Sequence, residues 1–196
     1  MTIIATKKIW GPKAWNLLHS FSINNNNKIP SNKKHNYYIF FTSFIYILPC
    51  DICSSHYSDI IYNINLLEEC KINRLYLIRW CYKTHNIVNK RLGKPKYLYN
   101  DFKDSYKKLE NYVSHKDIFY ILFYTLKNID YSKISLYKYD QIYNFFINFC
   151  LLYPDVIKRK NLKNIVKSVS FKEVKTPLQF KKWFFDNIIE IKNIIY

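Results

Sequence analysis

The apolar positions of the first hundred residues recur every three or four residues, which predicts amphipathic α-helices. The first pattern follows Gly11 and Pro12, and proline is well placed in the first turn of a helix. After a polar loop, we expect Ser31 to cap a second helix that Pro49 ends. These signals predict two helices ahead of the first reactive side chains.

Two further helices are expected before residue 100. One is predicted to start at the pair Cys50 and Cys53 and to run to about Leu67. The next is predicted over about Asn73–Leu92, where a glycine and then a proline follow, which is a usual helix stop. The first part of the chain is therefore expected to be a bundle with short connections.

The second half of the chain also has a helical pattern, in long apolar and aromatic segments such as 117–129 and 139–153. It carries no compact cluster of reactive side chains. The whole chain has only two glycines, which disfavours a β-protein with many turns. We expect an all-α protein, with a bundle of four or five helices in residues 1–104 and a C-terminal helical region of unknown role in residues 105–196.

The charge of the chain favours anionic partners. Its 196 residues carry a formal net charge of +17, which attracts nucleic acid, acidic membranes or phosphate-bearing cofactors. Lysine supplies most of this charge, and arginine, which is typical of dedicated nucleic-acid surfaces, is scarce. A generic basic surface and a nucleic-acid footprint both stay open.

Membrane and secretory classes are disfavoured. Residues 1–9 lack the apolar core of a signal peptide. The richest apolar run, 37–48, is too short to span a bilayer. We therefore expect no transmembrane segment, and five cysteines without a secretory signal favour metal or redox chemistry over a disulfide scaffold.

The C-x-x-C pair can be a zinc clamp or a redox disulfide. Zinc could take Cys50 and Cys53 with His56 and His85, but structural zinc sites usually bring two close pairs of ligands, and the second pair is missing, so no metal site is predicted. A thiolate at a helix N-terminus is stabilised by backbone N–H groups and by the helix dipole. The flanking segments are helical rather than thioredoxin-like, so a flavin is the candidate electron acceptor.

The fourth helix offers groups that a nucleotide needs. His85 and Asn89 lie four apart on one face, Trp80 lies more than a turn earlier, and Lys94 follows the helix. Adenine can stack and be hydrogen-bonded by such groups, and a cation can neutralise pyrophosphate. A core tryptophan with a satisfied histidine and a surface asparagine is the alternative.

Three motifs in order resemble the Erv/ALR FAD-linked sulfhydryl oxidases, most closely the compact viral members. The resemblance covers about residues 8–100. The motifs are Gly11-x-x-x-Trp15-x-x-x-His19, Pro49-Cys50-x-x-Cys53 and Trp80-x-x-x-x-His85-Asn86-x-Val88-Asn89-x-x-Leu92-Gly93-Lys94-Pro95.

The resemblance implies an FAD-dependent thiol oxidase that acts as a homodimer. Cys53 would lie against the isoalloxazine, and Cys50 would exchange with protein thiol substrates, with O2 as the final acceptor and H2O2 as product. His56 is left open. The implied FAD-binding residues are Gly11, Trp15, His19, Trp80, Tyr82, His85, Asn86, Asn89 and Lys94.

The sequence also departs from this family. Lys83 replaces a histidine found in many members. The stretch 96–100, directly after Gly93–Pro95, contains no cysteine, so we expect Cys81 to be a buried thiol and not half of a structural disulfide. No second C-x-x-C is present, so substrates reach Cys50 directly or through a thioredoxin-like relay protein.

Assembly in a virion or in host cytoplasm is the expected setting. The rival hypothesis is a non-enzymatic basic helical protein that belongs to a virion or associates with nucleic acid.

Overall fold

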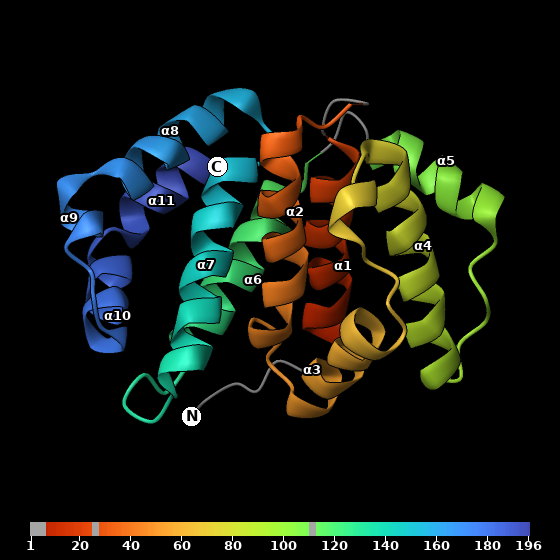
Figure 1. The fold of residues 1–196 in the computed structure, drawn as a ribbon, viewed down its shortest axis with the longest axis horizontal. Coiled ribbons are helices and arrows are strands. Elements are labelled where there is room, and N and C mark those ends of the chain that lie inside the picture. Colours follow the sequence, from red (N-terminus) through yellow and green to blue (C-terminus); the bar gives the residue numbers. More distant parts are fainter. Residues whose placement is uncertain (1–6, 25–27, 110–112) are drawn as a thin grey trace.

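The computed structural model describes residues 7–24, 28–109 and 113–196, and within these ranges the chain is all-α, as predicted. Figure 1 shows the arrangement of the helices. The α-helices are α1 (Lys7–Ile23), α2 (Ser31–Ser43), α3 (Asp51–Ser58), α4 (Arg74–Arg91), α5 (Tyr99–Leu109), α6 (His115–Asn128), α7 (Leu136–Leu152), α8 (Val156–Lys167), α9 (Val169–Lys172), α10 (Pro177–Asp186) and α11 (Ile188–Ile195). Short 3-10 turns η1 (Phe44–Tyr46) and η3 (Glu69–Lys71) and a π-helical turn η2 (Asp59–Asn63) complete the described elements.

The start and end signals of α4 are confirmed. The side chain of Asn73 accepts a hydrogen bond from the backbone N–H of Tyr76, which satisfies one of the unpaired donors of the first turn. Gly93 follows the helix with φ of +65°, a conformation that glycine adopts without strain. The helix that carries most of the predicted cofactor residues is therefore fixed at both ends.

Four predicted boundaries are wrong, the first being the end of the second helix, because α2 stops at Ser43 and a 3-10 turn follows it instead of a helix that runs to Pro49. Helix α1 begins at Lys7, so Pro12 lies inside it, and the extra turn buries Trp10 in the core. Ser31 is the first residue of α2 and does not cap it. The cap position is taken by Pro30, whose side chain can neither donate nor accept a hydrogen bond. The third helix ends in the π-helical turn before Asn65, whose φ of +48° turns the chain away, so it does not reach residue 67.

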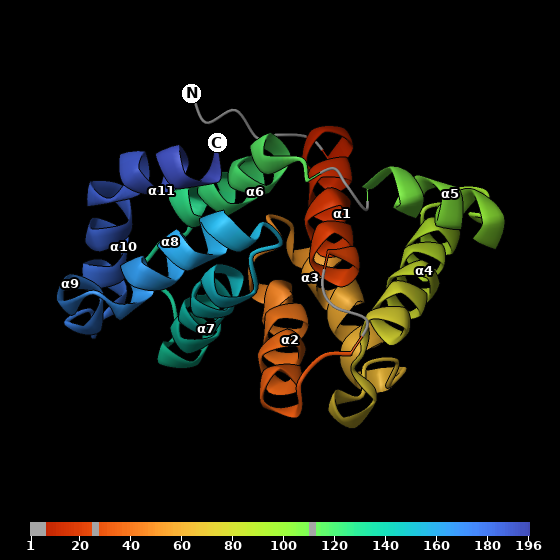
Figure 2. The ribbon, with the colours of Figure 1, turned by 90° about the horizontal axis from the view of Figure 1, so that it is seen from above.

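The C-terminal helices pack against the first two helices of the chain. Helix α6 lies against α1, and α7 lies against α2 (Figure 1). Seen from above, α6 and α7 stand between the α1–α2 pair and the outer helices α8–α11 (Figure 2). Buried aromatic side chains continue across this contact, as in the stack of Phe21, Phe40 and Phe145.

Two polar contacts also cross this junction. The amide of Asn36 in α2 donates to the side-chain oxygen of Asn148 in α7 at 2.7 Å. Lys13 and Asn16 of α1 both donate to the carboxylate of Asp117 in α6. Among the described helices, none combines the length and apolar character that a bilayer crossing requires.

Candidate active site

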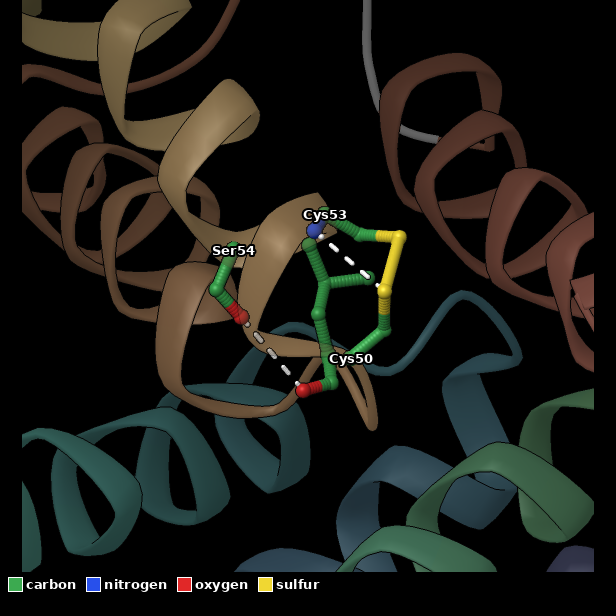
Figure 3. Close-up of a disulfide and its surroundings, with 4 residues drawn as sticks. Cys50, Cys53 and Ser54 are labelled. Carbon is green, nitrogen blue, oxygen red and sulfur yellow. Dashed lines mark hydrogen bonds between the residues drawn. A yellow bond between two sulfur atoms is a disulfide. The ribbon is translucent and has the colours of Figure 1, made fainter. Parts of the chain in front are cut away.

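The two cysteines of the C-x-x-C lie at the start of α3 and form a disulfide (Figure 3). Cys50 is the N-cap residue of the helix, with extended backbone, and its Sγ accepts a hydrogen bond of 3.3 Å from the backbone N–H of Cys53. Their Cα atoms are 5.2 Å apart, within the range that a disulfide spans. The backbone N–H of Cys53 therefore lies against the Cys50 sulfur, and both cysteines are at the positive end of the helix dipole, which favours their thiolate forms.

A cavity of about 630 Å³ lies beside this disulfide, in the size range of small-molecule and cofactor sites. Its wall is formed by α1, by η1 and α3, by the C-terminal half of α4 and by the segment that leads into α5. Cys53 is one of the lining residues, whereas Cys50 is not. The predicted FAD-binding residues on the wall are Gly11, Trp15, His19, His85, Asn89 and Lys94.

Three rings from α1 and α4 cluster on the wall. The indole of Trp15 stacks on the imidazole of His85, with ring centroids 4.1 Å apart and planes within 7°. His19 is tilted against both rings, at 5.5 Å from Trp15 and 5.6 Å from His85. Residues 70 positions apart in the sequence thus make one flat, polarisable surface, which suits a planar heterocycle.

Both imidazoles are held in the neutral form. Burial, and then the charge of His85, lower the pKa of His19 to about 3. Burial, and then the charge of Lys94, lower the pKa of His85 to about 4. At neutral pH each ring therefore offers one N–H donor and one nitrogen acceptor to a ligand rather than a positive charge.

Positive charge at the cavity comes from lysine and arginine side chains. Lys8, Arg91 and Lys94 lie on the wall. Arg91 is anchored by α3, because its guanidinium donates to the backbone carbonyl of His56 and to the carboxylate of Asp59. Cations on the wall of an otherwise apolar cavity suit a ligand that carries phosphate.

Asn86 supports the wall from behind and is not a lining residue. Its side chain receives a 2.7 Å hydrogen bond from the backbone N–H of Tyr97 and donates a 3.1 Å hydrogen bond to the carbonyl of the same residue. Tyr97 lines the cavity and hydrogen-bonds Ser105 of α5. Asn86 therefore fixes the segment between α4 and α5 through the backbone.

Two of the predicted cofactor residues lie away from the cavity. Trp80 is buried in the core, where its ring meets Phe41 at 5.0 Å and Tyr57 at 6.3 Å. Tyr82 packs edge-on against Tyr99 and Phe102 of α5. The position of Trp80 is that of the alternative considered above, a core tryptophan.

Several lining residues were left open or missed by the sequence reasoning. His56, which was left open, lies on the wall. The spacing gives a signal for it, because residues three apart share a helix face, and His56 is three positions after Cys53. Arg91, Tyr97 and Ser105 carry no motif that would have identified them.

These residues fit FAD on observations of the structure itself. Among the described residues, Nδ1 of His85 has no hydrogen-bond partner although it is buried, and it belongs to a ring on the cavity wall. A Cβ added at Gly11 would meet no atom within 4 Å, so no protein contact demands glycine there, although glycine weakens a helix interior. A ligand that approaches the backbone would explain both features.

The fold and the site define an all-α redox protein with a dithiol–disulfide pair beside a cavity for an aromatic, phosphate-bearing cofactor. The family model described as the Erv1/Alr family matches residues 12–107. A probable FAD-linked sulfhydryl oxidase of Acanthamoeba polyphaga mimivirus is 32% identical over 90 residues, which are 46% of this chain and 63% of the relative. FAD-linked sulfhydryl oxidases of two African swine fever virus isolates are 30% identical over 98 residues, which are 50% of this chain and 80% of each relative.

The chain belongs to the Erv1/Alr family of FAD-linked sulfhydryl oxidases. It spans just under two thirds of the length of the mimivirus relative. No solved structure matches the chain. The region matched by the family model ends two residues before the end of α5, so it includes the lining residues of the cavity except Lys8, Trp10 and Gly11, and it does not include α6–α11.

Proposed function

We propose that this protein is a thiol oxidase that forms disulfides in protein substrates through Cys50 and Cys53, with FAD in the adjoining cavity. The observation that carries the proposal is the position of the disulfide, which caps α3 and presents Cys53, but not Cys50, to the cavity wall. One sulfur can therefore meet a substrate while the other faces the cofactor. We assign this activity to residues 1–104 and treat residues 105–196 as a separate C-terminal region.

The exchange begins at Cys50. A substrate thiolate attacks its Sγ, which forms a mixed disulfide and expels Cys53 as a thiolate. A second substrate thiolate then attacks the substrate sulfur of the mixed disulfide and expels the Cys50 thiolate. Two substrate thiols have become one disulfide, and the pair of electrons now resides on the reduced Cys50 and Cys53.

The N-terminus of α3 stabilises both leaving thiolates, that of Cys53 in the first exchange and that of Cys50 in the second. A leaving thiolate at Cys50 keeps the backbone N–H of Cys53 as a donor. A leaving thiolate at Cys53 lies within the first turn, where the helix dipole favours negative charge. Both sulfurs are therefore good leaving groups, which speeds exchange in either direction.

The cavity supplies the second half of the reaction. Bound FAD would supply the acceptor for the electron pair of the dithiol, with O2 as the final acceptor and H2O2 as the product. Trp15, His19 and His85 would hold a ring of the cofactor, and Arg91 and Lys94 would neutralise its pyrophosphate. The neutral imidazoles add no positive charge, so the cations set the charge of the site.

Alanine substitution of the two cysteines tests this proposal. Cys50→Ala and Cys53→Ala should each abolish oxygen consumption with dithiothreitol, while the purified protein keeps its flavin, because neither thiol is needed to fill the cavity. Cys70→Ala is the matched control, since this exposed cysteine lies outside the site, and it should keep full activity. Full activity in either single variant of the pair would refute the mechanism.

The oligomeric state, the partner protein and the location of the reaction are proposed from the resemblance alone. A homodimer, a thioredoxin-like relay protein and action in host cytoplasm or in the virion are the corresponding proposals. The viral origin of the relatives supports the setting.

A further inference from the structure

Helix α8 carries a line of positive charge that the oxidase site does not use. Arg159, Lys163 and Lys167 are four residues apart, so they lie on one face of the helix over about 12 Å. Lys33 at the start of α2 adds a fourth charge from across the helix junction. We call these four residues the basic stripe.

The four cations are close enough to act on one another. Burial first, and then the neighbouring charges of Lys33, Arg159 and Lys167, lower the pKa of the Lys163 amine. Like charges four apart on a helix destabilise it. The stripe therefore carries an internal repulsion that a bound anion would relieve.

The stripe has little acidic compensation among the described residues, where the nearest carboxylate along its row is that of Asp155, one turn before Arg159. Helix α8 contains no Asp or Glu, and the carboxylate of its N-cap, Asp155, accepts hydrogen bonds from the backbone N–H groups of Ile157 and Lys158. In the part of the chain that the structure describes, none of the four stripe residues forms an ion pair. The repulsion is therefore left for a partner to offset.

The helix holds the stripe in a fixed place. Leu162 and Ile165 bury the opposite face of α8, which packs on α7 and α11. The guanidinium of Arg159 donates to the carbonyl of Tyr153 at 3.0 Å, which anchors one end. A rigid row of cations needs little ordering when it binds.

The chemistry of the neighbouring surface favours nucleic acid over a lipid bilayer. Interfacial helices insert an apolar face along their length into the membrane, whereas Leu162 and Ile165 of α8 are buried in the protein and its exposed apolar residues, Val156 and Ile157, are confined to the first turn. Asn164, about 100° around the helix from Lys163, is exposed on the neighbouring side of α8. Lysine, arginine and asparagine side chains are common donors to phosphate and sugar. We propose that the basic stripe binds the phosphate backbone of nucleic acid without regard to sequence.

Salt dependence of binding to a fluorescent 20-base-pair DNA duplex tests this proposal in the full-length protein. A site that neutralises four phosphates gives a slope of about −3.6 in log K against log salt. Lys163→Gln with Lys167→Gln should reduce the magnitude of this slope by about 1.8 and weaken binding at low salt.

The matched control removes the same charge from the other end of the molecule. Lys103 and Lys108 are exposed on α5, which lies across the protein from α8 (Figures 1 and 2). Lys103→Gln with Lys108→Gln should leave the slope close to that of the wild type. Both double variants should keep their dithiothreitol oxidase activity, which shows that they are folded.

Two results would overturn the proposal. Equal losses of slope in the two double variants would mean that the overall charge of +17, and not the stripe, attracts DNA. Binding to vesicles that contain phosphatidylserine, with no binding to the duplex under the same conditions, would assign the stripe to a membrane surface.

Discussion

Replacing the buried His19 tests whether the cavity holds neutral imidazoles. His19 is 6% exposed, and burial is the main cause that lowers its pKa to about 3. In the unfolded chain a histidine titrates near pH 6.5. On acidification below pH 6.5 the unfolded state therefore takes up a proton that the folded state does not, and the free energy of unfolding falls.

The size of the effect follows from the linkage relation. Each pH unit between the two pKa values costs about 1.4 kcal/mol. Between pH 7 and pH 5, about 1.5 pH units lie below the pKa of the unfolded histidine. Protonation of His19 in the unfolded state therefore lowers the free energy of unfolding by about 2 kcal/mol over this range. The loss continues toward pH 3, and His19 contributes no pH dependence above pH 7.5.

Urea denaturation of flavin-free protein at pH 7 and pH 5, at constant ionic strength, measures this loss. The wild type should lose about 2 kcal/mol more than His19→Gln over this range, because Gln does not titrate. Ser20→Ala is the control, since it perturbs the same buried turn of α1 and should keep the wild-type pH dependence. An unchanged pH dependence in His19→Gln would refute the assignment of a depressed pKa to this ring.

Three other predictions concern the framework of the site. Trp80→Ala should lower the free energy of unfolding by about 3–5 kcal/mol in urea denaturation, because a fully buried indole leaves a cavity; a cost below 1 kcal/mol would contradict its place in the core. Asn86→Ala should cost about 1–3 kcal/mol and weaken flavin retention on dialysis, since the segment between α4 and α5 loses both side-chain hydrogen bonds; unchanged retention would exclude this support of the cavity. A thiol reagent should label Cys70 in the native oxidised protein, and it should label Cys81 and Cys150 only after denaturation. Rapid labelling of Cys81 and Cys150 in the native protein would contradict the burial of these two thiols.

Local signals in the sequence were sufficient for the helices and the redox pair. Cys50 caps α3 because an extended residue after Pro49 leaves the first-turn N–H groups unpaired, and a sulfur atom three residues before Cys53 can accept one of them. The absence of a cysteine in residues 96–100 correctly predicted that Cys81 is buried and outside any described disulfide. These features depend on residues that are close together in the sequence, so the sequence pattern is enough to predict them.

Helix geometry explains which cofactor residues could be predicted on α4. His85 and Asn89 are separated by about 400° of rotation, which returns them to one face, and both line the cavity. Trp80 and His85 are separated by about 500°, which places them some 140° apart, so both cannot face the same cavity. Trp80 therefore packs on α2 and α3. The rotation between Trp80 and His85 is enough to predict that only one of them faces the cavity.

Contacts between distant segments could not be read from the sequence. The packing of α6 and α7 against α1 and α2 joins residues about 100 positions apart, and apolar periodicity shows that a helix face is buried without showing against what. The stacking of Trp15 on His85 also joins residues that are distant in the sequence, so apolar periodicity does not predict it. Tyr97 and Ser105 reach the cavity only because Asn86 holds the chain between α4 and α5.

The most direct test of the account is the visible absorption spectrum of the purified protein, before and after dithiothreitol is added under air. The account predicts a flavin band that bleaches on addition of the dithiol and returns as it is exhausted, with oxygen consumed throughout. A protein that is colourless, and stays colourless after incubation with FAD and removal of the excess, would contradict the assignment of the cavity and of the oxidase activity together.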